Sequence, residues 1–169
     1  MNKAYLLIAS WLLINSYSAL AEEPADAEFY GIAKLYAVQA SLSDIDGSGT
    51  AFEFGFSRNI TPNFSTEFTF LSGEVEADDF DASVDATALN FTGVFKQPVS
   101  DKGRLFGKVG IALWDSDGDL GEDDGTDLVL GFGLEQMTSE QLALRFEFNI
   151  ADYGDLETTS LAFGTNIYF

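Results

Sequence analysis

Carboxylates are the side chains of this sequence whose spacing is suited to chemistry, and they are densest in one segment. Between residues 115 and 125 the acidic positions are Asp115, Asp117, Asp119, Glu122, Asp123 and Asp124. Carboxylate oxygens on a glycine-rich turn can bind Ca²⁺ or Mg²⁺. An EF-hand loop, however, requires Gly at its sixth position and Glu at its twelfth, where this sequence has Leu120 and Thr126. We therefore favour a solvated acidic loop, with a divalent-cation site as the alternative.

A second set of charged residues is spread through segments that are otherwise apolar or small. Its members are Lys34, Glu53, Glu67, Lys108, Glu135, Arg145 and Glu147. Paired carboxylates can act as general acid and base, but carboxylates mixed with Lys and Arg in a narrow interior form ion pairs. Because burying an unpaired charge is costly, we predict that these residues form an internal ion network and that the protein is not an enzyme.

The overall composition excludes several classes of protein. The chain has 169 residues, with Lys+Arg 8, Asp+Glu 28, a formal net charge of -20, and neither His nor Cys. Without His or Cys, the chain cannot use Ser-His-Asp or Cys-His catalysis, bind metal or haem through these residues, or form a disulfide. We therefore expect no cofactor. The negative charge opposes binding to nucleic acid, whereas 46% hydrophobic residues and 16 Phe exclude an acidic disordered chain.

The N-terminal residues 1–21 have the composition of a secretory signal peptide. Lys3 provides the positive charge, residues 4–14 form an apolar run, and Ala19-Leu20-Ala21 is a small-residue cleavage site. The apolar run is shorter than the ~20 residues that a spanning helix needs. We therefore predict one mature domain over residues 22–169.

The dominant pattern of the remaining sequence is an alternation with a period of two. In residues 142–150, every second residue is Leu, Phe or Ile, and Ala, Arg, Glu and Asn lie between them. Such alternation marks strands at about 29–40, 52–57, 64–70, 89–95, 107–114, 128–135, 142–150 and 161–169. Short polar turns alternate with longer acidic connections at 41–49, 72–85, 115–127 and 152–157. The pattern predicts an all-β fold, an eight-stranded antiparallel up-and-down transmembrane β-barrel.

A soluble lipocalin-like barrel has a similar strand pattern but the opposite orientation of its two faces. In a lipocalin the large apolar side chains would line the interior, around a ligand. The other face here carries only seven charges over eight strands, together with glycines such as Gly55, Gly110 and Gly131. This composition is poor for a soluble surface and suits a narrow interior, so we favour the membrane barrel.

Aromatic residues near the strand ends are interpreted as two interfacial girdles. At the short-turn end we place Phe29, Phe56, Phe64, Phe95, Phe106 and Phe169, and at the long-loop end Phe52, Phe70, Trp114 and Tyr153. The final strand carries Phe163, Ile167 and Phe169 on one face. It resembles the C-terminal signature that outer-membrane proteins present to their assembly machinery.

The mature chain resembles the eight-stranded barrel of the OmpA-like family of outer-membrane proteins. The resemblance rests on Ala33-Lys34-Leu35, Thr61-Pro62 followed by Glu67, residues 131–135 and residues 144–148. It implies an inward cluster of Arg, Lys and two Glu that closes the lumen, which Glu67, Glu135 and Arg145 match best. On the fourth strand, Val94 or Thr92 stands where the family has Lys, so Lys108 or Lys34 would substitute. The family's peptidoglycan-binding domain is absent from this sequence.

We therefore expect an integral outer-membrane protein of a Gram-negative cell, with a structural or surface-interaction role, acidic extracellular loops and a closed, charge-paired lumen. A narrow, cation-preferring, porin-like channel is the first alternative, and a soluble periplasmic lipocalin-like barrel is the second. The expected partners are outer-membrane lipid, lipopolysaccharide and the assembly machinery, with divalent cations as a further partner if the alternative reading of the acidic loop holds. The protein is expected to be a monomer.

Overall fold

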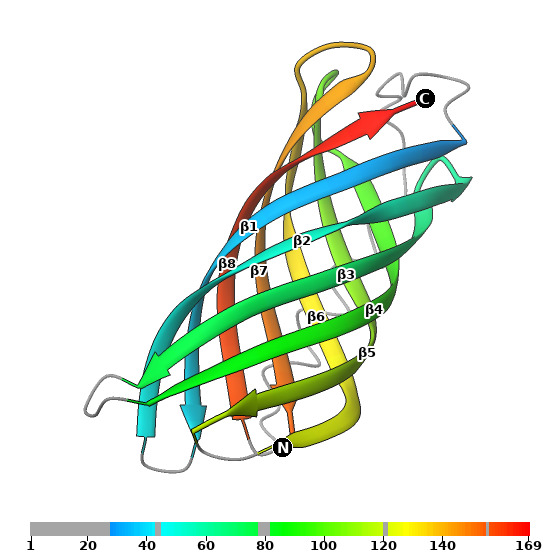
Figure 1. Ribbon diagram of the computed structural model, residues 1–169. Coiled ribbons are helices and arrows are strands. Elements are labelled where there is room, and N and C mark those ends of the chain that lie inside the picture. Colours follow the sequence, from blue (N-terminus) through cyan, green and yellow to red (C-terminus); the bar gives the residue numbers. More distant parts are fainter. Residues whose placement is uncertain (1–27, 43–44, 78–81, 120–121, 155) are drawn as a thin grey trace, which may run out of the picture.

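The computed structural model describes residues 28–42, 45–77, 82–119, 122–154 and 156–169. These residues form one closed barrel in which every strand is antiparallel to its neighbours, and β1 closes against β8 (Figure 1). The strands are β1 (Phe29–Leu42), β2 (Ile45–Thr61), β3 (Phe64–Ala77), β4 (Ser83–Pro98), β5 (Gly103–Gly118), β6 (Asp123–Met137), β7 (Leu142–Tyr153) and β8 (Leu156–Tyr168). The predicted eight-stranded up-and-down fold is confirmed. The predicted signal peptide lies outside the described residues.

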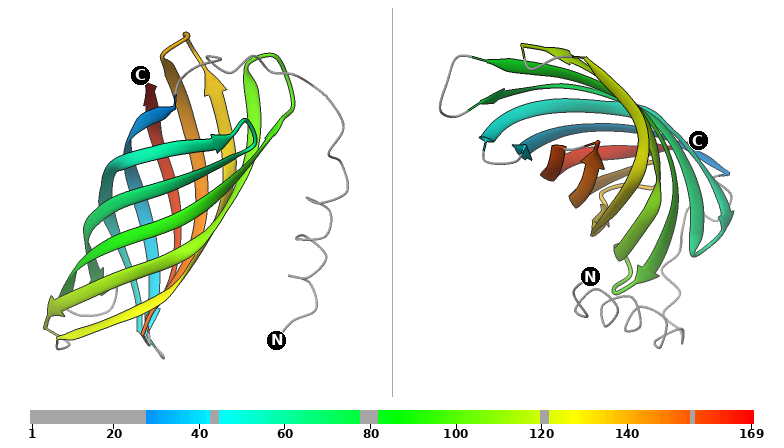
Figure 2. Two further views of the ribbon diagram at one scale, coloured as in Figure 1. Left: turned by 90° about the vertical axis from the view of Figure 1, so that its right-hand side faces the viewer. Right: turned by 90° about the horizontal axis from the view of Figure 1, so that it is seen from below.

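The connections between strands differ in length and charge between the two ends of the barrel. Short turns join β2 to β3, β4 to β5 and β6 to β7 at the upper end of Figure 1, which we name the turn end. The other connections lie at the opposite, loop end. Figure 2 shows the strands inclined to the barrel axis, with the β5–β6 hairpin projecting at the lower left of the left-hand view.

The acidic connections at the loop end are mostly strand rather than loop, which corrects the sequence-based boundaries. Residues 115 and 124 are directly paired across β5 and β6, within the segment expected to be a loop. A strand that extends beyond the apolar band meets polar surroundings on both faces. It therefore lacks the apolar alternation by which strands were recognised.

The apolar face of each strand points outward, away from the lumen. Exposed large side chains include Leu35, Phe54, Phe91, Leu128, Phe132 and Phe163. The opposite face is buried and carries charged, hydroxyl-bearing and small residues. An apolar exterior around a polar interior is the reverse of a lipocalin, so the soluble alternative is wrong. Among the described residues, no helix is long and apolar enough to cross a bilayer.

Three aromatic residues assigned to the interfacial girdles point inward instead. Tyr153 shares the inward-facing parity of Glu147 on β7 and packs against Trp114. Phe106 is 4% exposed and Trp114 is 6% exposed. Both lie on the same face of β5 as Lys108, whereas Val109, Ile111 and Leu113 form the exposed face of that strand. These side chains occupy inward-facing positions in the alternation of their strands, so they point into the lumen although they lie near a strand end.

Candidate functional site

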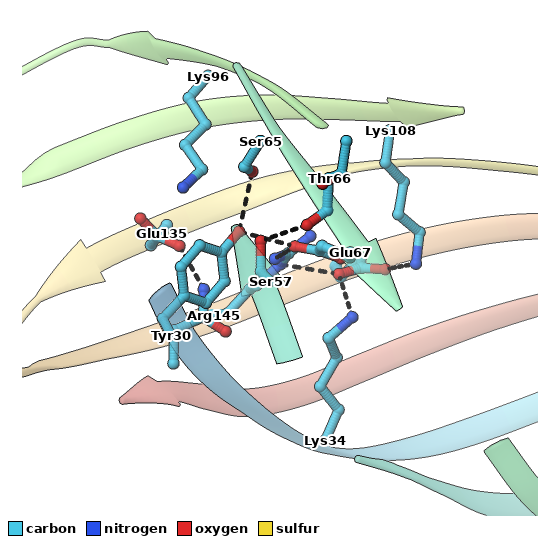
Figure 3. Close-up of polar contacts among 12 residues, drawn as sticks. Tyr30, Lys34, Ser57, Ser65, Thr66, Glu67, Lys96, Lys108, Glu135 and Arg145 are labelled. Atoms are coloured by element: carbon cyan, nitrogen blue, oxygen red, sulfur yellow. Dashed lines mark hydrogen bonds and ion pairs between the residues drawn. The ribbon is translucent and has the colours of Figure 1, made fainter. Parts of the chain in front are cut away.

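Glu147, on β7, is the centre of an ion cluster inside the barrel. One carboxylate oxygen lies 3.1 Å from Lys34 Nζ and 2.9 Å from Arg145 Nε, and the other oxygen pairs with Lys108 Nζ. These four side chains are at most 4% exposed. Figure 3 shows Lys34 and Lys108 extending from different strands toward the centre of the cluster. One carboxylate thus joins cations from β1, β5 and β7.

Two further carboxylates complete the charge balance of this cluster. Glu53 accepts a hydrogen bond of 2.9 Å from Lys34 Nζ and a second from the Tyr36 hydroxyl. Glu67 accepts from Arg145 Nη1 at 2.5 Å and from the Tyr30 hydroxyl at 3.1 Å (Figure 3). The central cluster therefore consists of three cations and three carboxylates, each carboxylate being held by at least two donors.

Glu135 lies apart from the central cluster, nearer the turn end. It accepts hydrogen bonds from Asn166 Nδ2 at 2.6 Å, from the Tyr168 hydroxyl at 2.9 Å and from Arg104 Nη1 at 3.4 Å. Arg145 lies directly opposite Glu135 in the β6–β7 register but pairs with Glu67 and Glu147 instead. The structure thus brings together six of the seven residues of the expected network and places the seventh in a separate group.

The sequence reading missed two inward cations. Lys96 on β4 is 4% exposed, and its Nζ lies 4.4 Å from the ring centre of Tyr30 and 3.3 Å from Asn59 Oδ1. Arg104 on β5 is 2% exposed. Both lie on the inward parity just beyond the expected strand limits at residues 95 and 107. Extending the alternation a few residues further would have found them.

Glycines on the inward face provide room for the long cationic side chains. A Cβ at Gly164 would lie 2.6 Å from Lys34 Cγ and 2.2 Å from the carbonyl oxygen of Ala33. A Cβ at Gly131 would lie 2.8 Å from Lys108 Cε. The Arg145 guanidinium, in turn, packs 3.9 Å from the ring centre of Phe106. The small and aromatic residues beside the charges thus shape the space that the charges occupy.

Apolar layers lie on both sides of the charged cluster. The turn-side layer consists of Tyr30, Ile32, Met137, Ala143 and Tyr168. The loop-side layer consists of Ala88, Ala112, Trp114, Val129 and Ala151, with Leu71 and Tyr153 packed against it. Leu71 also packs against Tyr36, Ala51 and Ala162, next to the Glu53 contact. The central cluster therefore lies between these two layers, and the turn-side layer also contacts the buried charges of Glu135 and Lys96.

Trp114 anchors the loop-side layer through a specific polar contact. Its Nε1 donates a hydrogen bond of 2.8 Å to Asp127 Oδ2, and the backbone N–H of Gly154 donates to the same oxygen at 3.0 Å. Asp127 lies on the loop side of Leu128, where the apolar outer face of β6 ends. The Gly154 N–H, and secondarily the Trp114 indole, lower the pKa of the Asp127 carboxyl by stabilising its charged form.

The loop end carries an acidic rim of outward-facing side chains on the extended hairpins. Carboxylates are directly opposite one another at Glu74 and Asp85, Asp85 and Asp117, Asp115 and Asp124, and Asp152 and Glu157. All of these side chains are exposed. The rim thus places negative charges side by side with no compensating cation between them in the strand register.

The residues proposed for cation binding are spread along the β5–β6 hairpin. Asp115 and Asp117 lie on the exposed face of β5, and Asp119 follows the strand and accepts a hydrogen bond at its Oδ2 from the Ser83 N–H. Glu122 and Asp123 are exposed beside Asp124. Within the described part of the chain, no three acidic side chains form a group that could hold a metal ion. The divalent-cation site, kept as the alternative to a solvated acidic loop, therefore has no assembled set of ligands among the described residues.

The C-terminal residues expected to serve as an assembly signal lie on the outer surface of the barrel. Phe163, Ile167 and Phe169 are all exposed, and Phe169 is 76% exposed. The Phe169 N–H donates to the carbonyl oxygen of Phe29, which continues the β1–β8 pairing to the end of the chain. These side chains form an apolar strip along the seam that closes the barrel.

Known proteins with the same architecture are outer-membrane proteins. The chain is 14% identical to Neisserial surface protein A (NspA), with a TM-score of 0.70 over 84% of this chain and 97% of that one. It is 11% identical to Ail, the attachment invasion locus protein of Yersinia pestis, with a TM-score of 0.63 over 85% and 100%. For OprG from Pseudomonas aeruginosa the identity is 11% and the TM-score 0.58, over 85% and 97%. These similarities show a shared fold.

The family comparison assigns the chain directly. No curated protein matches it. The family model described as "outer membrane protein beta-barrel domain" matches residues 7–169, which is nearly the whole sequence. The closed barrel with an apolar exterior and a charged interior agrees with that match. The chain belongs to the outer membrane protein beta-barrel domain family and is a protein of the Gram-negative outer membrane.

Proposed function

We propose that this protein is a closed, non-enzymatic outer-membrane barrel whose acidic loop end faces the cell exterior and makes its interactions there. The observation that carries this proposal is the ion-paired cluster around Glu147, enclosed between two apolar layers. A lumen of this kind stabilises the barrel and has an apolar layer on its loop side.

The arrangement of the lumen argues against conduction and against catalysis. An ion entering from the loop end would have to lose its hydration at the layer formed by Trp114, Tyr153 and Leu71. Desolvation of an unpaired charge is costly, so this layer is a barrier. The carboxylates of the cluster are already paired with Lys and Arg and are not free to contact a substrate. These features support the closed barrel over the channel.

The interactions follow from the outer surface. The acidic rim would approach lipopolysaccharide, itself anionic, through divalent cations, because direct contact with phosphate would be repulsive. A structure of Ail contains the heparin analogue sucrose octasulfate. The rim of the present barrel opposes a polyanion of that kind, so we do not carry that ligand over. Recognition of the C-terminal strip by the assembly machinery, cleavage of residues 1–21 and a monomeric state complete the proposal.

Planar-bilayer recording of the refolded mature chain tests this function. We expect no steady channels for the unaltered protein. A double variant, Trp114→Ala with Tyr153→Ala, removes the largest side chains of the loop-side layer and should increase the frequency of brief openings. Leu113→Ala on the lipid-facing surface of β5 is the matched control and should leave the recordings unchanged. Steady cation-selective conductance of the unaltered protein would overturn the closed-barrel proposal.

A further inference from the structure

Two grooves lie on the outer wall of the barrel, where the apolar band meets the acidic rim. The first spans β3 to β6 and has a volume of about 560 Å³. The second spans β1 to β4 and has a volume of about 510 Å³. Volumes of this size suit a small molecule or a single lipid chain rather than a folded protein segment. Most of the residues that line them, such as Leu113 and Phe52, lie on the outward-facing parity of their strands.

The two grooves have the same sequence of chemical groups along their length. In the first, Leu113 lies opposite Leu89 and Thr126, and in the next outward-facing row Asp115 lies opposite Thr87 and Asp124. In the second, Phe52 lies opposite Leu35 and Ser72, and in the next outward-facing row Glu74 lies opposite Thr50 and Asp85. Neither groove is lined by Lys or Arg. The repeated order defines an amphiphile site with an anionic end.

The acidic pair at the end of each groove favours a cation. Like charges directly opposite each other on neighbouring strands destabilise the pairing. An ammonium group placed between two such carboxylates removes this repulsion and can donate up to three hydrogen bonds. A bare metal ion fits less well, because no three acidic side chains gather in the described part of the chain.

We propose that each groove docks one membrane lipid that carries a primary ammonium in its headgroup. The acyl chain lies along the apolar part of the groove, the hydroxyls contact the polar linkage, and the ammonium lies between the two carboxylates. A lipid with an anionic headgroup and no amine is disfavoured at the same place. The orientation of the acidic loop end toward the outer leaflet is part of the proposed function, so this inference rests on the proposed function for the leaflet in which the lipid lies. The chemistry of the recognition does not depend on that orientation.

Native mass spectrometry of the refolded mature chain in detergent tests this proposal. The probes are phosphatidylethanolamine and phosphatidylglycerol with the same acyl chains, supplied with and without EDTA. We expect preferential retention of phosphatidylethanolamine, independent of EDTA. Two double variants, Asp115→Asn with Asp124→Asn and Glu74→Gln with Asp85→Asn, should each lower that retention about threefold to fivefold, as expected for exposed ion pairs. Phosphatidylglycerol binding should rise or stay the same.

The control is Asp152→Asn with Glu157→Gln, which neutralises an acidic pair of the same kind that lines neither groove. It should retain the full preference for phosphatidylethanolamine. Equal retention of both lipids, an equal loss in the control, or loss of the preference with EDTA would overturn the proposal. Displacement of the lipid by a cationic amphipathic peptide with no lipid preference would also overturn it. Bilayer conductance does not depend on these carboxylates. The bilayer recordings would therefore test the closed-barrel proposal independently of lipid binding.

Discussion

Most of the charged side chains in the described residues lie in two regions with opposite surroundings, the buried lumen and the exposed acidic rim. In the lumen, carboxylates alternate with Lys and Arg, and Glu147 alone contacts three cations within a fully buried cluster. On the rim, Asp85 has acidic partners on both neighbouring strands and remains exposed. A buried charge needs a partner, because desolvation is costly, whereas solvent and salt screen exposed charges. Stability therefore depends on the lumen, which leaves the rim available for interactions.

Glu147→Gln should show most strongly that the lumen, and not the rim, determines stability. The substitution leaves Lys34, Lys108 and Arg145 with one carboxylate fewer in a buried space. Removing one partner of a buried ionic group costs about 3–5 kcal/mol, so we expect the free energy of unfolding to fall by about that amount. Urea unfolding of the protein refolded into lipid vesicles, followed by cold electrophoretic mobility, measures the change.

The matched control for this prediction is Asp152→Asn, an equally conservative neutralisation five residues further along β7. Asp152 is exposed and faces Glu157, so the free energy of unfolding should change by less than about 0.5 kcal/mol. Similar losses in the two variants would mean that the buried cluster does not dominate stability.

Gly164→Ala tests whether the space around the buried charges is also required. The added Cβ would lie 2.2 Å from the carbonyl oxygen of Ala33 and 2.6 Å from Lys34 Cγ, so backbone or side chain must move. Overpacking of this kind costs about 1–3 kcal/mol. Gly31→Ala is the control, because its nearest contact is Phe169 at 3.6 Å. An unchanged unfolding midpoint for Gly164→Ala would show that the lumen tolerates the extra volume.

The amino-acid sequence predicts the lumen better than it predicts the rim. Alternation with a period of two identifies all eight strands, the outward apolar face and the inward position of the seven predicted charges, because each strand borders lipid on one side only. At the loop end both faces meet polar surroundings, so the extension of β5 and β6 has no such signal. Lys96 and Arg104 lie at the other ends of their strands, on the inward-facing parity just beyond the expected strand limits.

The pairing within the lumen could not be predicted from any single strand. Arg145 and Glu67 are 78 positions apart and meet across the interior. Their contact depends on the tilt and register of all strands around the closed barrel. Residue types and parity therefore predicted which side chains face inward, while the choice between Glu67 and Glu135 as the partner of Arg145 required the three-dimensional arrangement.

Asp115→Asn should show that the rim is electrostatically unfavourable in itself. The substitution removes the repulsion from Asp124, which lies directly opposite. We expect a gain of about 0.3 kcal/mol in the free energy of unfolding at low ionic strength and none at high salt, where exposed charges are screened. Asp46→Asn, which faces Ser41, is the control and should show no salt-dependent gain. A loss of stability for Asp115→Asn would contradict a purely repulsive pair.

Asp127 lies at the border between the lumen and the rim, and its titration should give the smallest effect. Hydrogen bonds from the Gly154 N–H and the Trp114 indole hold the pKa of its carboxyl below the usual value of about 3.9. A carboxyl with a lowered pKa contributes stability that is fully present above its unfolded pKa and is lost as the pH falls through the folded pKa. Contacts of Trp114 should therefore loosen only below about pH 4.

Trp114 reports this change directly, because the only other tryptophan, Trp11, belongs to the predicted signal peptide. Its fluorescence should shift in a single step at acidic pH, while the barrel stays folded by far-ultraviolet circular dichroism. Asp127→Asn should remove the step, whereas Asp124→Asn should leave it unchanged. If the fluorescence step persisted in the Asp127→Asn variant, the titrating group would be a carboxyl of the acidic rim. The hydrogen bonds to Asp127 would then not control the closure of the loop end.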